Sequence, residues 1–283
     1  MSARVLVTGA AGGIGGAAVA ELKRQGARVV GLDLAPGDDP DTLACDVRDQ
    51  ESVDRAVAEA IERLGGLDVL INNAGIGTPQ SAGAAPDAGA LAVLDVNLLG
   101  PWRVTAAALP ALRASRGRVV NVASGLAHMS LPFAPAYCMS KRGLVAYSDA
   151  LRLEHGEAIT VTTVYPGYIR TGIHDASRDA GLSLESAVPA ERVEDAARTL
   201  ARAALGPPAR DLATTRRGAV GYVFLRHLPR RVMDRILFAR IRRLSGRGAF
   251  SDTGLAGELA TRLRSDPPRA PGPPDRARIT TGG

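Results

Sequence analysis

The chain has 283 residues, 46% of them apolar, and a formal net charge of +6. This length and composition predict one large hydrophobic core, so we expect a single α/β domain followed by an extension. The charge is local, because residues 210–247 contain eleven Arg and two Asp, which leaves the rest of the chain at −3. A pI near 9.9 therefore does not by itself indicate nucleic-acid binding.

Cysteine usage and apolar runs indicate the cellular setting. Cys45 and Cys138 lie in segments that we expect to be internal, and they lack the spacing of a disulfide framework or a metal site. The sequence thus predicts a reduced, cytoplasmic setting and no metal. It predicts no signal sequence, because a strand begins almost at once at Arg4. The longest clean apolar run, Ala219–Leu225, is too short to span a bilayer.

The first predicted strand, Arg4–Thr8, leads into a glycine-rich turn and a helix that runs to about Gln25. Gly9, Gly13 and Gly15 permit a tight turn and let a diphosphate approach the backbone. Unpaired N–H groups and the helix dipole favour anions at a helix N-terminus. Such a turn alone is a weak signal, but here it joins a strand to a helix.

A second predicted strand, Ala27–Leu32, ends at Asp33, eighteen residues after Gly15. An acid at this position can accept hydrogen bonds from the adenosine ribose hydroxyls and repels a 2′-phosphate. An ordinary turn would not explain the strand, the glycines and the acid together. The sequence therefore predicts a dinucleotide site that prefers NAD over NADP.

Strands and helices continue to alternate after this unit. Thr42–Val47 is predicted to be a short strand in which Asp46 can contact adenine, and Gln50–Leu64 is predicted to be a helix. A strand over Leu67–Ile71 then runs into Asn72–Gly75. The alternation predicts a parallel, doubly wound sheet, a Rossmann-type three-layer α/β sandwich, with its sites at the C-terminal ends of the strands.

Residues 76–90 are rich in Gly, Ala and Pro and are predicted to form a loop that leads into a helix containing Asn97. Pro101 then begins another helical run to about Arg113. Taken alone, Asn97 is explained equally well by a helix cap or a backbone contact.

A predicted strand over Gly117–Ala123 exposes Ser124 at its C-terminal end, and a helix over Tyr137–Glu154 follows an apolar loop. Tyr137 and Lys141 are four residues apart and so share one helix face. A cation about 5 Å from the phenol, at an effective dielectric of about 20, stabilises its anion by about 3 kcal/mol. We therefore expect the pKa of Tyr137 to fall by about two units.

This arrangement predicts general acid–base chemistry, in which Ser124 holds a substrate oxygen while Tyr137 exchanges a proton with it. The alternative is a solvated helix face, because a Tyr and a Lys four residues apart are common. The choice between the two depends on the other motifs of the chain.

The rest of the predicted domain, residues 1–215, begins with a strand over Thr160–Tyr165. Gly172–Pro189 is polar and aperiodic, as a mobile lid would be. A helix over Ala190–Leu205 and a short strand near Asp211–Thr215 complete the domain.

Residues 216–264 are predicted to form an Arg-rich helical extension, and residues 265–283, with five Pro and three Gly, a disordered tail. Pro229 is suited to begin a helix. Apolar residues then recur at helical spacing: Val232, Met233, Ile236, Leu237, Ile241 and Leu244. We expect this stripe to dock on the protein itself or on a second copy, or on an anionic membrane, where each basic residue contributes about 1 kcal/mol.

With these residues assembled, the chain resembles the short-chain dehydrogenase/reductase family over about Arg4–Thr215. An ordered set of motifs carries the resemblance: Thr8-Gly9-x3-Gly13-x-Gly15, Asp33, Asp46, Asn72-Asn73-Ala74-Gly75, Asn97, Ser124, Tyr137-x3-Lys141, Pro166-Gly167 and Thr171. The resemblance implies an NAD-dependent oxidoreductase that moves a hydride between nicotinamide and a secondary alcohol or ketone.

The resemblance also implies roles for single residues, with Asn97, Ser124, Tyr137 and Lys141 as the catalytic set. Lys141 would grip the nicotinamide ribose, Asn97 would hold a water that links Lys141 to solvent, and Thr171 would meet the carboxamide. Cofactor contacts are expected from the turns and strand ends: Thr8, Gly9, Gly13, Ile14, Gly15, Asp33, Asp46, Val47, Asn73, Ala74, Gly75, Tyr137, Lys141, Pro166, Gly167, Ile169 and Thr171.

The loop after Ser124 is mostly apolar and the lid has no cluster of Arg or Lys, which together predict an apolar, fairly bulky substrate: Leu126, Met129, Leu131, Pro132 and Phe133. We expect a homo-oligomer, although the long extension separates this chain from many family members. A catalytically idle cofactor-binding protein is one alternative, but it would have lost Ser124, Tyr137 or Lys141. A nucleic-acid or membrane-binding module is another, and the Arg-rich end lacks the interleaved aromatics of single-strand binders.

Overall fold

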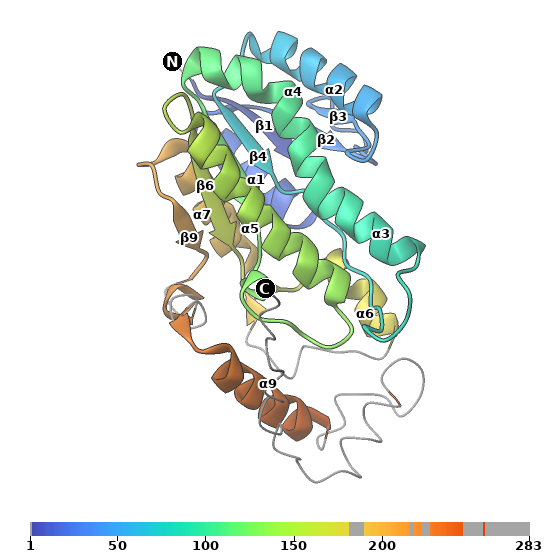
Figure 1. The fold of residues 1–283 in the computed structure, drawn as a ribbon. Coiled ribbons are helices and arrows are strands. Elements are labelled where there is room, and N and C mark those ends of the chain that lie inside the picture. The colour runs from blue at the N-terminus through green and yellow to red at the C-terminus, as the bar shows by residue number, and fades with distance from the viewer. Residues whose placement is uncertain (1, 181–189, 216–217, 222–226, 246–256, 258–283) are drawn as a thin grey trace, which may run out of the picture.

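The computed structural model describes residues 2–180, 190–215, 218–221, 227–245 and 257. Seven parallel strands form one sheet in the order β3-β2-β1-β4-β5-β6-β9, with helices on both faces (Figure 1). The strands are β1 Arg4–Thr8, β2 Arg28–Asp33, β3 Thr42–Ala44, β4 Val69–Asn72, β5 Arg118–Val122, β6 Thr160–Tyr165 and β9 Asp211–Ala213. This is the doubly wound three-layer α/β sandwich that the sequence predicts.

Two layers of helices cover the sheet because its strands are apolar on both sides. Helices α1 (Gly13–Arg24) and α7 (Val193–Leu205) pack on one face, and α2 (Gln50–Leu64), α4 (Gly100–Ser115) and α5 (Pro135–His155) pack on the other. Alternate residues of β1 serve the two faces, as the pleat requires, since Leu6 packs with α2 and α4 while Val5 and Val7 pack with α1 and α7.

The strand order reverses between β1 and β4, because the chain first winds outward to β3 and then returns to β4. Ligands of open α/β sheets bind in the crevice at such a reversal, outside the C-terminal ends of the strands. The predicted motifs at the ends of β1, β2, β4, β5 and β6 therefore meet at one edge of the sheet.

The two predicted helical runs around Asn97 are in fact continuous. Helix α3 (Ala88–Leu94) passes through a π-helical turn, Asp95–Leu99, directly into α4. Pro101 lies at the start of α4, directly after the π-turn, and the run continues through it. A single π-turn of this kind is often found at a functional site.

Two segments after β6 also differ from the predictions. The predicted helix over Ala190–Leu205 begins only at Val193, because Ala190–Glu191 form a short strand, β8, that pairs with β7 (Tyr168–Ile169). The predicted lid contains a short 3-10 turn, Gly172–His174, and helix α6, Asp175–Asp179, and its residues 181–189 lie outside the described chain.

Part of the predicted extension is described. Residues 218–221 are helical, and α9 spans Arg230–Ser245 below the sheet (Figure 1). The residues predicted to share one apolar stripe are buried unequally. Met233 is buried and Leu237 and Ile241 are half-buried, whereas Val232 and Ile236 are 41% and 48% exposed. The reason is that Met233, Leu237 and Ile241, four residues apart, define the inner face, and Val232 and Ile236 lie about 100° away.

The side chain of Leu244 and the predicted tail, residues 265–283, lie outside the described residues. Within the part of the chain that the structure describes, no helix is both long and apolar enough to cross a membrane.

Candidate active site

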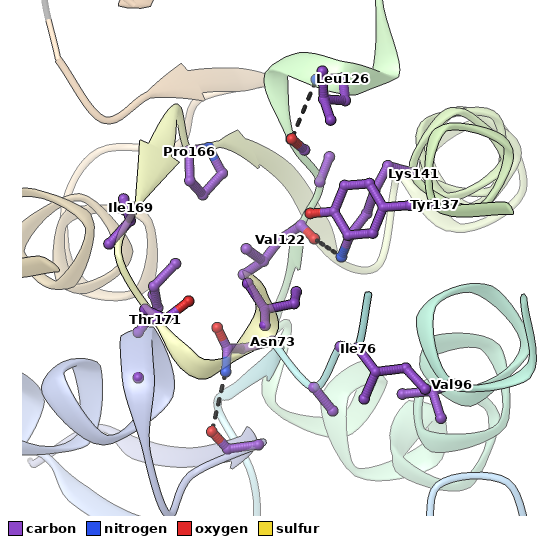
Figure 2. A pocket seen from close by; sticks show the side chains of 18 of the residues that line it. Asn73, Ile76, Val96, Val122, Leu126, Tyr137, Lys141, Pro166, Ile169 and Thr171 are labelled. Atoms are coloured by element: carbon purple, nitrogen blue, oxygen red, sulfur yellow. Dashed lines mark hydrogen bonds between the residues drawn. The ribbon is translucent and has the colours of Figure 1, made fainter. Parts of the chain in front are cut away.

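A cavity of about 690 Å³ opens at the C-terminal edge of the sheet (Figure 2). Most of the predicted site residues line it: Gly9, Gly13, Ile14, Asp33, Asp46, Val47, Asn73, Ala74, Gly75, Ser124, Tyr137, Lys141, Pro166, Gly167, Ile169 and Thr171. Thr8, Gly15 and Asn97 do not line it, and their positions indicate supporting roles.

The glycine turn after β1 needs its glycines for two different reasons. Gly9 and Gly13 have φ of 65° and 56°, a left-handed conformation that other residues rarely adopt. A Cβ atom on Gly15 would lie 1.9 Å from the Gly9 carbonyl oxygen. Gly15 therefore lets the first turn of α1 pack against the preceding loop, and it has no face on the cavity.

Thr8 and Asn73 tie the end of β1 to the end of β4. The Thr8 hydroxyl oxygen accepts hydrogen bonds from the N–H groups of Asn73 and Ala74, each at 3.0 Å. The Asn73 amide nitrogen donates to the carbonyl oxygens of Thr8 and Gly9, each at 3.1 Å. Thr8 is 2% exposed, so it shapes the crevice without facing it.

Asp33 closes the nucleotide end of the cavity. One carboxylate oxygen accepts the Ala11 N–H at 2.9 Å and the other accepts the Ala35 N–H at 3.1 Å. These bonds fix the carboxylate beside the glycine turn, where the sequence places the adenosine ribose.

Sequence reasoning missed Arg48, which also lines this end of the cavity. Its guanidinium pairs with Asp46 at 2.7 Å, and the Asp46 carboxylate also accepts the Arg48 N–H at 2.9 Å. The pairing lowers the pKa of Asp46 below its usual value, chiefly through the side-chain hydrogen bond. The only available signal was its spacing, two residues beyond an acid at a strand end.

Tyr137 and Lys141 reach the cavity from α5 (Figure 2), and Ser124, two residues beyond β5, also lines it. Lys141 is 3% exposed, and its ammonium donates to the Val122 carbonyl oxygen at 2.9 Å. The same nitrogen lies 5.8 Å from the centroid of the Tyr137 ring. The Tyr137 phenol hydrogen-bonds to the Ser124 side chain.

The pKa of Tyr137 does not fall as expected. Burial raises it to about 12, and the hydrogen bond with Ser124 opposes that rise only in part. Burial also lowers the pKa of Lys141 to about 8. The expectation was wrong because it counted the attraction of the cation and left out the loss of hydration by both groups.

Asn97 lies in the π-turn and is fully buried, and its side chain bonds to the backbone of Ile76, a residue that lines the cavity. Its side-chain oxygen accepts the Ile76 N–H at 2.8 Å, and its nitrogen donates to the Ile76 carbonyl at 2.9 Å and to Ser140 Oγ at 3.2 Å. A Cβ atom on Gly75 would lie 3.3 Å from the Asn97 oxygen and 3.5 Å from Lys141 Nζ. Asn97 therefore fixes the backbone next to Lys141, which matches the backbone-contact interpretation.

The turn after β6 brings Pro166, Gly167, Ile169 and Thr171 to the cavity. Pro166, Ile169 and Thr171 face Tyr137 across it (Figure 2). Thr171 precedes the 3-10 turn of the lid, but its side chain makes no capping hydrogen bond there. A Cβ atom on Gly13 would lie 3.5 Å from the Thr171 methyl carbon. Thr171 thus reaches across the cavity to the glycine turn.

The wall beyond Ser124 and Tyr137 is mostly apolar, with Arg240 as its one charged contributor among the described residues. Three of the five predicted loop residues line it, Leu126, Met129 and Leu131, whereas Pro132 and Phe133 do not. Sequence reasoning missed the contributions of Ile173 from the lid and of Leu237, Arg240 and Ile241 from α9. His128 does not line the cavity, and its ring lies 5.2 Å from that of Tyr165.

Comparisons with known proteins agree with this geometry. Residues 3–181 match the family model described as short chain dehydrogenase. Retinol dehydrogenase 16 of Mus musculus is 38% identical over 188 residues, which are 62% of this chain and 59% of that protein. A putative ketoacyl reductase of Streptomyces coelicolor is 36% identical over 191 residues, 62% of this chain and 73% of that one. The chain therefore spans about three fifths of the retinol dehydrogenase's length.

Among solved structures, a short chain dehydrogenase from Burkholderia cenocepacia, in complex with NADP, is similar at a TM-score of 0.70 and 27% identity. The similarity covers 82% of this chain and 96% of that one. Together with the family match over more than half of the sequence, these findings show that the chain belongs to the short chain dehydrogenase family.

Proposed function

We propose that this protein is a nicotinamide-dependent oxidoreductase that interconverts a secondary alcohol and a ketone. The observation that carries the proposal is the meeting of Ser124, Tyr137 and Lys141 in the cavity that the glycine turn and Asp33 also line. Retinol dehydrogenase 16 and 17-beta-hydroxysteroid dehydrogenase type 6 are named for alcohol substrates and are 38% and 36% identical to this chain. Membership of the family supports the same reaction class here.

The residues present fit a nicotinamide dinucleotide. Glycines with positive φ leave the start of α1 open to a diphosphate, and a side chain on Gly9 would meet Ala74 Cα at 2.8 Å. Asp33 is fixed at the ribose end, and Thr171, Ile169 and Lys141 lie at the other end of the cavity. When bound, the cofactor supplies or accepts the hydride at C4 of its nicotinamide ring.

Ser124 and Tyr137 handle the substrate oxygen. In ketone reduction the Tyr137 hydroxyl donates its proton to the carbonyl oxygen, and Ser124 holds that oxygen by a second hydrogen bond. The raised pKa of Tyr137, about 12, keeps the phenol protonated and suits this direction. Alcohol oxidation requires the phenolate, whose charge the nearby Lys141 ammonium stabilises.

The test of the proposal is turnover by the purified protein. A panel of alcohols with oxidised cofactor, and of ketones with reduced cofactor, is followed through the near-ultraviolet absorbance of reduced nicotinamide. We expect turnover with at least one member of the panel and none with the Tyr137→Phe variant. Cofactor binding without any turnover across a broad panel would instead favour a catalytically idle cofactor-binding protein.

We propose NAD(H) as the preferred cofactor. Asp33 places a carboxylate where a 2′-phosphate would lie, and a like-charge contact costs several kcal/mol when desolvated. Arg48, a cation at this end, is already paired with Asp46. The Burkholderia cenocepacia relative was solved with NADP, so the preference has to be measured for this chain as the ratio of kcat/KM values.

We also propose an apolar, fairly bulky substrate. Leu126, Met129, Leu131, Leu237 and Ile241 line the cavity beyond Ser124. Burial of substrate carbon against such side chains contributes about 25 cal/mol per Å². Hydrophobic ketones or alcohols should therefore show higher kcat/KM than short sugars or acids of the same reaction class.

A homo-oligomer is proposed from the exposed apolar residues of α4 and α5. Trp102 is 57% exposed although it packs on Tyr147, and Met139 and Leu153 are 55% and 89% exposed. Exposed large apolar groups on neighbouring helices are typical of subunit contacts. Light scattering after gel filtration should show an oligomer that Trp102→Asp dissociates and Val220→Asp, at another exposed apolar residue, does not.

Peripheral contact of a cytoplasmic protein with an anionic membrane is a second proposal, supported by the exposed residues of α9. Val232 and Ile236 are exposed on one flank of the helix and Phe238 on the other, and the exposed Arg231 and Arg235 lie between them. Each basic residue near such a surface contributes about 1 kcal/mol. Salt-sensitive co-sedimentation with phosphatidylserine vesicles, lost on Arg231→Glu/Arg235→Glu, is the expected result; equal sedimentation with neutral vesicles would contradict it.

A further inference from the structure

One carboxylate outside the catalytic set receives hydrogen bonds from two remote segments. Glu191, the last residue of β8, accepts the Gly167 N–H on Oε2 at 2.9 Å. It accepts the Thr214 hydroxyl on the same oxygen and the Thr215 hydroxyl on Oε1 at 2.6 Å. Neither composition nor the motifs singled out this residue, because its partners lie 23 or more positions away.

The first of these segments is the turn that faces the nicotinamide end of the cavity. Gly167 and its neighbour Ile169 line that cavity. The strands β7 and β8 pair through Tyr168 with Ala190 and Ile169 with Glu191. A Cβ atom on Gly167 would lie 2.7 Å from the Glu191 carboxyl carbon. The turn is therefore held on one side by backbone pairing and on the other by this carboxylate.

The second segment begins the C-terminal extension. Thr215 follows β9, its hydroxyl oxygen accepts the Gly218 N–H at 2.9 Å, and its carbonyl accepts the Ala219 N–H at 2.9 Å. Thr215 thus holds the start of the next helical residues while it donates to Glu191. Further along the same extension, Leu237 and Ile241 of α9 form part of the cavity wall.

We propose that Glu191 is a positioning residue that joins the nicotinamide-facing turn to the start of the C-terminal extension. One carboxylate then fixes both the turn at Gly167, which lines the cavity, and the start of the extension that leads to α9. Hydrogen bonds to an ionised acceptor are roughly twice as strong as neutral ones. The carboxylate accepts from all three donors at once. The cofactor part of this proposal rests on the proposed function; the joining of the two segments does not.

Cofactor affinity tests the contact between Glu191 and the turn at Gly167. Glu191→Ala should raise the dissociation constant for NADH about tenfold, measured by calorimetry, because the turn loses a charge-assisted bond. Glu191→Gln should stay within about threefold of wild type, because its amide oxygen still accepts the Gly167 N–H and a threonine hydroxyl can accept as well as donate. Glu194→Ala is the matched control, since Glu194 is exposed three residues further on and pairs only with Arg192 in the hydrogen bonds described.

Limited trypsin digestion tests the contact between Glu191 and the start of the extension, and it does not require enzyme activity. The extension holds cleavage sites at Arg216, Arg217 and Arg226. Glu191→Ala and the double variant Thr214→Val/Thr215→Val should both speed the first cut in the extension about tenfold, since each loses the hydroxyl–carboxylate bonds. The double variant should leave the NADH dissociation constant nearer to wild type than Glu191→Ala does.

Thermal unfolding of every variant separates positioning from loss of the fold, because a purely structural role would lower Tm without changing NADH affinity far below it. A folded Glu191→Ala protein with wild-type NADH affinity, or with unchanged cleavage of the extension, would overturn the proposal. Failure of the wild-type protein to bind NADH would instead overturn the cofactor assignment, and the digestion would still decide the join.

Discussion

The two ends of the cavity differ in which atoms form their walls. At the end proposed for the nucleotide, the wall is largely backbone, in the glycine turn and at the ends of β2 and β4, and the fixed side chain of Asp33 completes it. At the substrate end apolar side chains from a loop, the lid and α9 form it. A wall made of backbone demands particular residues at particular positions, whereas an apolar wall accepts many. This contrast explains why the family's cofactor chemistry can be read from motifs and its substrates cannot.

The largest expected effect lies where the two ends meet. Tyr137→Phe removes the proton that the proposed mechanism transfers but little contact area. We expect kcat to fall at least about a hundredfold, while the NADH dissociation constant stays within about twofold. Steady-state kinetics and calorimetry measure the two quantities.

Tyr147→Phe is the matched control for this change, because Tyr147 lies on the same helix and packs on Trp102 away from the cavity. Its kcat should be close to that of the wild type. If Tyr137→Phe keeps more than about a hundredth of wild-type kcat, the phenol is not the acid–base group.

The nucleotide end is probed by Asp33. Replacing it with Asn removes the charge but keeps one acceptor for the Ala11 or Ala35 N–H. We expect the ratio of kcat/KM for NAD to that for NADP to fall about thirtyfold, the equivalent of about 2 kcal/mol. Comparable kcat/KM values for the two cofactors in the wild-type protein would already contradict the prediction.

Arg48→Ala tests the missed cation at the same end. Arg48 is paired with Asp46. Its loss should therefore change the ratio of kcat/KM for NAD to that for NADP much less than Asp33→Asn does. A large gain in NAD preference for Arg48→Ala would mean that Arg48 leaves Asp46 and binds the 2′-phosphate.

Burial of Lys141 should reduce the stability of the protein without added cofactor. Burial lowers the pKa of Lys141 to about 8, whereas the unfolded value is about 10.4. Between these values the unfolded chain binds more protons than the folded one, so this group makes stability rise with pH across that window. Below about pH 8 the buried ammonium of Lys141 lowers the free energy of unfolding by its full amount.

Lys141→Met should therefore increase the free energy of unfolding at pH 7 by about 1–2 kcal/mol, measured with urea, and abolish turnover. The advantage should shrink as the pH rises from about 8 towards 10. An advantage independent of pH would show that better packing, rather than removal of a buried charge, is its cause.

The same contrast explains which parts of the fold and the site can be predicted from the sequence. Strand β1 and helix α2 were predicted with the bounds that the structure shows, because regular apolar spacing and an acidic cap determine them. Gly9 and Gly13 were predictable because only glycine suits their φ values. Arg48, Glu191 and the part of α9 that lines the cavity were not, because their roles depend on contacts between segments far apart in the chain, and local spacing carries no record of such contacts.

The smallest expected effect concerns the wall that sequence reasoning missed. Leu237 of α9 is half-buried against the cavity, so Leu237→Ala removes about 1 kcal/mol of apolar contact with a bulky substrate. That loss corresponds to about a fivefold rise in KM. The NADH dissociation constant should not change, because the nucleotide end is formed by other segments. Val232→Ala, at an exposed position on the same helix, should leave KM as it is. If Leu237→Ala weakened NADH binding as much as substrate binding, the two ends would not be independent, and the division between a backbone-built end and a side-chain-built end would have to be given up.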